Sequence, residues 1–168
     1  MKASLALLLF AVSVSAAAQS ADAIYKQACG QKGEVFDAQL IKGRALPVTE
    51  AGKALVVFIQ KQSGRRFTTR IGIDGVWVGA AQNDSYVFAF VVPGEHHTCA
   101  AGQDRKNPKP ELLHFTAEAG KVYYFLVRGI GVQAEGGDLA TLVLGVPDLD
   151  EALFLIASDP HSVASSRR

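Results

Sequence analysis

The stretch Glu95-His96-His97-Thr98-Cys99 holds the residue types best suited to chemistry in this chain. Imidazole and thiolate groups bind zinc, and a cysteine beside a histidine can act as a nucleophile. Neighbouring side chains on a β-strand point to opposite faces, so His96 and His97 cannot converge on one metal ion, whereas His97 and Cys99 share a face. We therefore expect no catalytic metal at the two histidines, and we predict no catalytic residue and no cofactor.

Whether Cys99 is free depends on the compartment, which the N-terminus indicates. Residues 1–18 resemble a secretory signal peptide: Lys2 is basic, residues 5–14 are apolar, and three alanines at 16–18 suit a signal peptidase. The apolar run is too short for a membrane-spanning helix, which takes about 20 residues. We expect a mature chain that begins near Gln19, is periplasmic or secreted, and has no stable membrane insertion.

The chain contains two cysteines, Cys29 and Cys99. An exported protein meets an oxidising environment, so we predict a disulfide bond between them. In the chain-entropy model, closing a loop of about 70 residues stabilises the fold by about 4 kcal/mol. A metal-dependent or thiol enzyme built from His97, Cys99 and His114 is an alternative, but its thiol form requires a free Cys99.

The charge balance argues against nucleic acid as a partner. Without Lys2, the Lys and Arg residues of the mature chain equal its 16 Asp and Glu residues. A neutral chain has no overall field to attract nucleic acid or an anionic membrane. The local basic cluster is interpreted as a solvated hairpin tip; it consists of Lys61, Arg65, Arg66 and Arg70. An unknown envelope protein or a saccharide is the expected partner.

The histidines and Cys99 belong to a region rich in strand signals. Short apolar or alternating runs cover residues 54–60, 67–73, 76–80, 86–92, 95–100, 112–117, 122–129 and 139–146. Asp74-Gly75 predicts a tight type I′ hairpin turn, and Pro93-Gly94 predicts a second turn. The pattern predicts a mainly β fold, an immunoglobulin-like or transthyretin-like β-sandwich of about seven strands.

The ends of the chain carry weaker signals. We interpret residues 19–53 as an irregular N-terminal arm attached through Cys29, with a short edge strand at 33–39 as one option. The sandwich domain is predicted to span residues 54–157, and residues 158–168 are predicted to be a flexible tail.

The sandwich domain is predicted to end in a short helix at residues 149–157. Leu149, Leu153 and Ile156 have the spacing of one helical face. Asp148 with Glu151 three residues later resembles a capping box.

Two segments, residues 72–100 and 115–129, resemble a known family. They combine an Asp-Gly hairpin, an Asn-x-Ser-Tyr turn, a Pro-Gly-x-His turn and an Ala-Gly-Lys-x-Tyr-Tyr stretch. In this order they are similar to exported bacterial β domains catalogued as domain of unknown function 2846. The likeness covers roughly residues 54–157, including the closing DEALFLIA segment. It implies an immunoglobulin-like or transthyretin-like sandwich in the cell envelope, and no known reaction.

Aromatic residues provide the remaining candidate site. Tyr86, Phe88 and Phe90 share one strand face, which we interpret as the sandwich core. Trp77 lies between two valines and Tyr124 has valines at 122 and 127 in its own strand, so we take both as the better candidates for an exposed surface that stacks on sugar rings. The leading hypothesis is a non-enzymatic domain for interaction or structural support. The alternative is a module that binds carbohydrate or peptidoglycan fragments.

Overall fold

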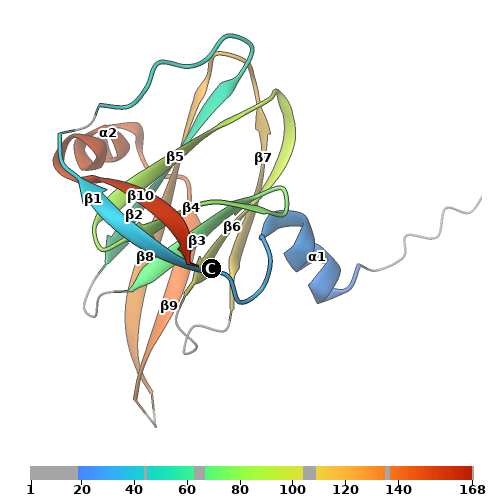
Figure 1. Cartoon of the computed structure of the whole chain (residues 1–168), viewed down its shortest axis with the longest axis vertical. Helices are drawn as coiled ribbons and strands as arrows, with labels where there is room; N and C mark the ends of the chain where they lie inside the picture. Colours follow the sequence, from blue (N-terminus) through green and yellow to red (C-terminus); the bar gives the residue numbers. More distant parts are fainter. Residues whose placement is uncertain (1–18, 44, 63–66, 104–108, 135–136, 168) are drawn as a thin grey trace, which may run out of the picture.

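The protein was analysed as a computed structural model, which describes residues 19–43, 45–62, 67–103, 109–134 and 137–167 (Figure 1). The predicted signal peptide, residues 1–18, lies outside these residues, as do Arg65 and Arg66. The described residues form ten strands in two sheets and two helices, which confirms a mainly β fold with a short C-terminal helix. No helix among them is long and apolar enough to cross a membrane.

The two sheets face each other as the layers of a sandwich. In spatial order, the six-stranded sheet consists of β1 (Val35–Ile41), β10 (His161–Arg167), β5 (Ser85–Val91), β2 (Ala54–Gln62), β8 (Val122–Ala134) and β9 (Gly137–Gly145). The four-stranded sheet consists of β4 (Val76–Gln82), β3 (Thr68–Ile73), β6 (Gly94–Gly102) and β7 (Glu111–Ala117). Two pairings in the larger sheet are parallel, β2 with β8 and β10 with β5.

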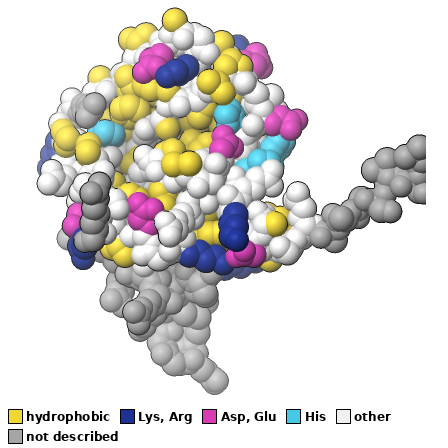
Figure 2. Space-filling view, turned by 45° about the vertical axis from the view of Figure 1, so that its right-hand side comes forward, with side chains coloured by type: hydrophobic (Ala, Val, Ile, Leu, Met, Phe, Trp, Pro, Cys, Tyr) yellow, Lys and Arg dark blue, Asp and Glu magenta, His cyan; other side chains and the backbone are white. Residues whose placement is uncertain are grey.

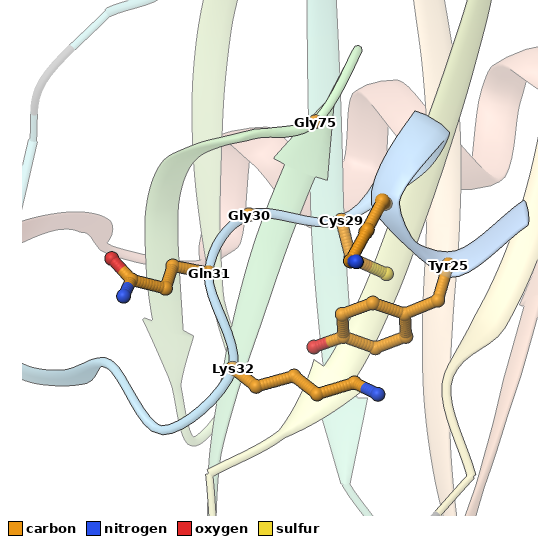
Figure 3. Close-up of a pocket in the computed structure, with 7 residues that line it drawn as sticks. Tyr25, Cys29, Gly30, Gln31, Lys32 and Gly75 are labelled. Atoms are coloured by element: carbon orange, nitrogen blue, oxygen red, sulfur yellow. The ribbon is translucent and has the colours of Figure 1, made fainter. Parts of the chain in front are cut away.

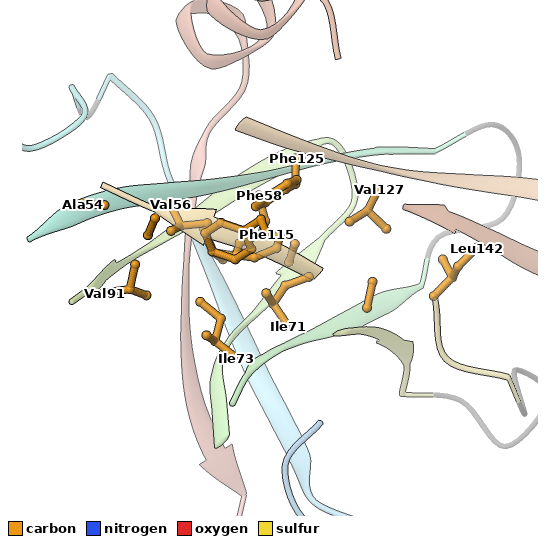
Figure 4. Close-up of a cluster of buried hydrophobic side chains, with 14 residues drawn as sticks. Ala54, Val56, Phe58, Ile71, Ile73, Val91, Phe115, Phe125, Val127 and Leu142 are labelled. Atoms are coloured by element: carbon orange, nitrogen blue, oxygen red, sulfur yellow. The ribbon is translucent and has the colours of Figure 1, made fainter. Parts of the chain in front are cut away.

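The core between the sheets is built by inward-facing residues of strands β2 to β9 (Figure 4). On β2, Val56 and Phe58 enter this core, while Leu55 and Val57 point to the outer side of the sheet. The outer side is also covered, so residues 54–60 of β2 are buried without interruption. This explains why its sequence is an unbroken apolar run and not an alternating one.

Helix α2 (Leu149–Ser158) forms where the sequence predicts a short C-terminal helix, and it covers the outer face of the six-stranded sheet. The Asp148 side chain caps it by accepting a hydrogen bond from the Asp150 amide at 2.9 Å. Glu151 pairs with Arg128, so the carboxylate expected in a capping box is bound elsewhere. The predicted apolar face of this helix is wrong in part, because two of its leucines do not pack against the sheet.

The helix buries Ala152 and Leu155, while Leu149 and Leu153 are 57% and 47% exposed. Apolar residues surround most of this helix, so spacing alone did not show which side packs against the sheet. The exposed leucines are therefore available to solvent or to a partner.

The aromatic row on β5 is packed against the protein, with Tyr86 fully and Phe88 and Phe90 partly buried, but not in the predicted place. Tyr86, Phe88 and Phe90 belong to the cluster under α2, on the outer face of the larger sheet. The ring centroid of Phe88 also lies 4.8 Å from that of His161 on β10. The residues that β5 contributes to the inter-sheet core are the valines of the opposite face, Val87 and Val91. The prediction that these three aromatic residues form the core between the sheets is therefore wrong, because they lie between the larger sheet and helix α2.

The two ends of the chain are ordered against each other. Residues 161–167 form β10, which pairs with all seven residues of β1 in antiparallel register. The Arg167 Nε donates to the Asp37 carboxylate at 3.0 Å. The prediction of a flexible tail over 158–168 is therefore wrong for residues 158–167, which the structure describes. Pairing between segments more than a hundred residues apart leaves no local pattern in a polar sequence such as HSVASSR.

The N-terminal arm is less irregular than predicted. It contains β1, close to the edge strand considered at 33–39, and a helix that the sequence did not predict, α1 (Ala21–Ala28). Ser20 caps α1 by accepting from the Ala23 amide at 3.2 Å. Helices α1 and α2 lie on opposite sides of the sandwich (Figure 1). Strands β1 and β10, at the two ends of the chain, raise the number of strands to ten, compared with the predicted number of about seven.

Two members of the basic cluster hold the fold together. Lys61 lies 2.7 Å from the Asp84 carboxylate and 3.4 Å from that of Asp159. The Arg70 guanidinium donates to the backbone oxygens of Glu34 and Gly102. For Lys61 and Arg70, the interpretation as a solvated hairpin tip is therefore wrong, because both bind groups of other elements.

Candidate functional site

The predicted disulfide bond is present. Cys29 follows α1 and Cys99 lies on β6, with their sulfurs 2.01 Å and their Cα atoms 5.3 Å apart. Both residues are buried, and no free cysteine occurs in the part of the chain that the structure describes. The bond fastens the N-terminal arm to the outer face of the four-stranded sheet. Cys99 in this bond has no thiolate to offer, whereas the thiol form of the enzyme hypothesis requires one.

Close backbone contacts seat the arm on this face. A Cβ added to Gly72 would lie 2.8 Å from the Ala28 carbonyl oxygen, and one added to Gly30 would lie 2.4 Å from the Trp77 ring. Only residues without a side chain allow so near an approach. Gly30 in the arm and Gly72 in the sheet thus allow the backbones of the two segments to pack closely.

Trp77 is part of this contact and not an open stacking surface. Its indole Nε1 donates to the Gln31 backbone oxygen at 2.9 Å, and the Arg70 guanidinium lies 4.7 Å from the centre of its ring. Gly30 packs against the same ring. The residue is half-buried, so the prediction that Trp77 offers an exposed surface to a sugar is wrong.

A hollow of about 470 Å³ opens beside the disulfide (Figure 3). It is lined by Tyr25, Lys26, Cys29, Gly30, Gln31, Lys32 and Gly75. The ammonium groups of Lys32 and Lys26 lie 2.7 and 2.9 Å from the Asp22 carboxylate. Hydrogen bonds from Lys32 and then Lys26 lower the pKa of Asp22 to about 2. Both cations at the hollow are thus already paired, which weakens the case for an anionic ligand there.

The Asp74-Gly75 turn between β3 and β4 has the predicted conformation. Both residues have positive φ, 49° at Asp74 and 79° at Gly75, as a type I′ turn requires. The Asp74 amide donates to the His97 carbonyl at 2.9 Å, and one Asp74 carboxylate oxygen accepts from the His97 amide at 2.9 Å. The turn is therefore bound to β6 as well as closing its own hairpin.

His96 is a structural residue of this turn. Its side chain points into the sandwich beside Phe115 and is 5% exposed. Nδ1 lies 2.6 Å from the Asp74 carboxylate and Nε2 lies 2.8 Å from the Val92 carbonyl oxygen. Burial lowers the pKa of His96, but the hydrogen bonds to Asp74 and Val92 outweigh it and raise the pKa above 6.5. Both ring nitrogens face oxygen acceptors, which leaves neither for a metal.

His97 lies on the opposite face of β6, as strand alternation predicts. In the antiparallel register of β6 and β7 it stands directly opposite His114, and the ring centroids are 5.1 Å apart. The Gln27 amide nitrogen of α1 lies 2.7 Å from the His97 Nε2, and the Glu95 carboxylate lies 3.9 Å from the His114 Nε2. No group of three His, Cys, Asp or Glu side chains in the described residues is arranged to hold a metal ion.

A second hollow, of about 400 Å³, opens between β7, β8 and the segment before α2. It is lined by Leu113, His114, Phe115, Val122, Tyr123, Tyr124, Phe125, Val146, Pro147 and Leu149. Tyr124 is half-buried and also packs in the cluster under α2, so only part of its ring is open to a ligand.

Beside this hollow lies an apolar surface that the sequence did not single out. Its side chains are exposed by 74% at Val146, 57% at Leu149, 47% at Leu153 and 71% at Phe154, and we call this set the α2 surface. Hydrophobic side chains also reach the surface on the side of the molecule drawn in Figure 2. The only sequence evidence for this surface was that the predicted helix contains more large apolar residues than a single buried face can hold.

Comparison with known proteins finds no matching family model, no similar curated protein and no similar solved structure. The likeness to the exported domain family therefore stays a prediction.

Proposed function

We propose that the chain is an exported, non-enzymatic β-sandwich domain that binds a protein of the cell envelope or supports its structure. The predicted signal peptide at residues 1–18 and the resemblance to an exported domain family both favour this role. The groups best suited to chemistry have structural partners: Cys99 is bonded to Cys29, and both nitrogens of His96 face oxygen acceptors.

The observation that carries the proposal is the α2 surface. Four large apolar side chains within nine residues are about half exposed or more, next to a hollow of about 400 Å³. A folded domain gains nothing from placing such residues in water, and grouped exposed apolar residues mark interaction sites.

The test compares surface variants of the exported protein. Leu149→Ser with Phe154→Ser removes two of the four side chains of the α2 surface. Val48→Ser with Val92→Ser is the matched control, since those valines are 88% and 61% exposed elsewhere. Each protein is cross-linked in native envelopes and purified. The proposal predicts a cross-linked species that the α2 variant loses and the control keeps. Equal cross-linking of the two variants, with unchanged melting curves, would contradict it.

With Trp77 covered by the N-terminal arm, one observation still supports the saccharide hypothesis. Tyr123 and Tyr124 both line the second hollow, and aromatic faces stack on sugar rings. Titration with peptidoglycan fragments should then show saturable binding that Tyr124→Ala abolishes. An equal response of wild type and variant would remove this candidate.

A further inference from the structure

We propose that His97 and His114 form an exchangeable binding site for a borderline divalent cation, with Cu²⁺ bound most tightly. The two residues belong to different strands, and only the register of β6 and β7 brings them opposite each other. Their ring centroids are 5.1 Å apart on the outer face of the four-stranded sheet. The site is distinct from His96, which points to the other face.

The hydrogen bond from α1 shows which atom of His97 is available. A glutamine amide nitrogen can only donate, so the His97 Nε2 accepts from Gln27 at 2.7 Å. The Nε2 lone pair, which a metal would take, therefore points away from the sheet toward an exposed side chain. A cation has only to displace Gln27, whereas at His96 it would have to break two buried hydrogen bonds.

The distance between the two residues suits a shared ion. Directly opposite residues of an antiparallel pair have Cβ atoms about 5 Å apart. A metal holds imidazole nitrogens at about 2.1 Å, so two rings on one ion need their nitrogens roughly 3 Å apart. The His114 side chain is half exposed, and His97 is partly buried. Rotation about their side-chain bonds can bring the nitrogens together without moving the strands.

The set of ligands determines the kind of site. Two imidazoles suit Cu²⁺, Ni²⁺ and Zn²⁺, and affinity rises toward Cu²⁺. Glu95 lies on the same face of β6, 77% exposed, with its carboxylate 3.9 Å from the His114 Nε2, and adds negative charge. Histidine and acidic side chains lie beside one another on this side of the molecule (Figure 2). With fewer than three gathered ligands, the remaining positions are open to water, so the ion exchanges and is not part of the fold.

The experiment titrates Cu²⁺ and Zn²⁺ into oxidised protein purified without a histidine tag, with glycine as a competing chelator. We expect one Cu²⁺ per chain and weaker binding of Zn²⁺. His97→Ala and His114→Gln should each weaken Cu²⁺ binding by more than about tenfold, because loss of even an outer partner costs that much. Gln27→Ala is the matched control on the same surface, and it should leave the affinity equal or higher because it removes a competitor.

A measurement on the unaltered chain covers the case in which a variant misfolds. Substoichiometric Cu²⁺ should broaden the ring proton signals of His97 and His114 before those of His96. The proposal is overturned if both histidine variants bind Cu²⁺ as the wild type does. It is equally overturned if Gln27→Ala loses binding as His97→Ala does, or if the His96 signals broaden first.

Discussion

Replacement of both disulfide cysteines, Cys29→Ala with Cys99→Ala, should strongly destabilise the protein. The bond joins residues separated by 70 positions. For a loop of this length, the chain-entropy model gives a loss of about 4 kcal/mol in the free energy of unfolding. Both cysteines are almost fully buried, so alanine leaves a small void, whereas serine would also bury a hydroxyl group.

The loss should be measured by urea unfolding of the wild type and the double variant. The urea slope of a domain of this size is about 2 kcal/mol per M, so the midpoint should fall by roughly 2 M. Hydrogen exchange supplies the spatial detail. Helix α1 shares few other contacts with the sheet, so its amides should lose protection before those of β2 and β8.

Wild-type protein unfolded under reducing conditions is the control, and it should match the double variant within error. A midpoint shift below about 0.5 M, less than about 1 kcal/mol at this slope, would refute the reasoning. It would mean that the contacts of Gly30, Gly72 and Trp77 hold the arm in place even in the unbonded chain.

Three further predictions concern the Asp74-Gly75 turn and the N-terminus. His96 has a pKa above 6.5 in the folded protein, so its contribution to stability is complete below its unfolded pKa and is lost as the pH rises through the folded value. His96→Gln should remove this pH dependence of the melting temperature, and an unchanged profile would contradict the assignment. Gly75→Val should cost more than about 1 kcal/mol, since φ is positive and a Cβ would lie 2.7 Å from the Lys26 carbonyl oxygen; an unaltered urea midpoint would argue against both causes. N-terminal sequencing of exported protein should begin near Gln19, and recovery of residues 1–18 in a membrane fraction would disprove cleavage.

The strands and tight turns of the central region were predictable because their signals are local. Asp74-Gly75 requires positive φ at two neighbouring positions, and the structure has both. The short apolar runs from residue 54 onward correspond to strands β2 to β9. The two-cysteine count was equally informative, since neither Cys29 nor Cys99 had another partner available.

The candidate sites were harder to predict because each depends on which elements meet. Trp77 seemed open to solvent because its neighbours on the strand are valines, yet Gly30 and Gln31 of the arm cover it. His114 could not be placed, because a loop of unknown path separates it from Cys99. The strand register then set it opposite His97.

The sequence alone determines three features of this protein: which side chains alternate along a strand, where the tight turns lie, and which cysteine bonds to which. The first two depend on neighbouring residues, and the third follows because the chain has only two cysteines. Alternation alone separates His96 from His97, and the structure keeps them on opposite faces. The pairing of β1 with β10, the face of α2 that packs and the meeting of His97 with His114 follow from tertiary packing. These depend on backbone hydrogen bonds and buried area shared by segments far apart in the chain, and such energies leave little trace in any short stretch of residues.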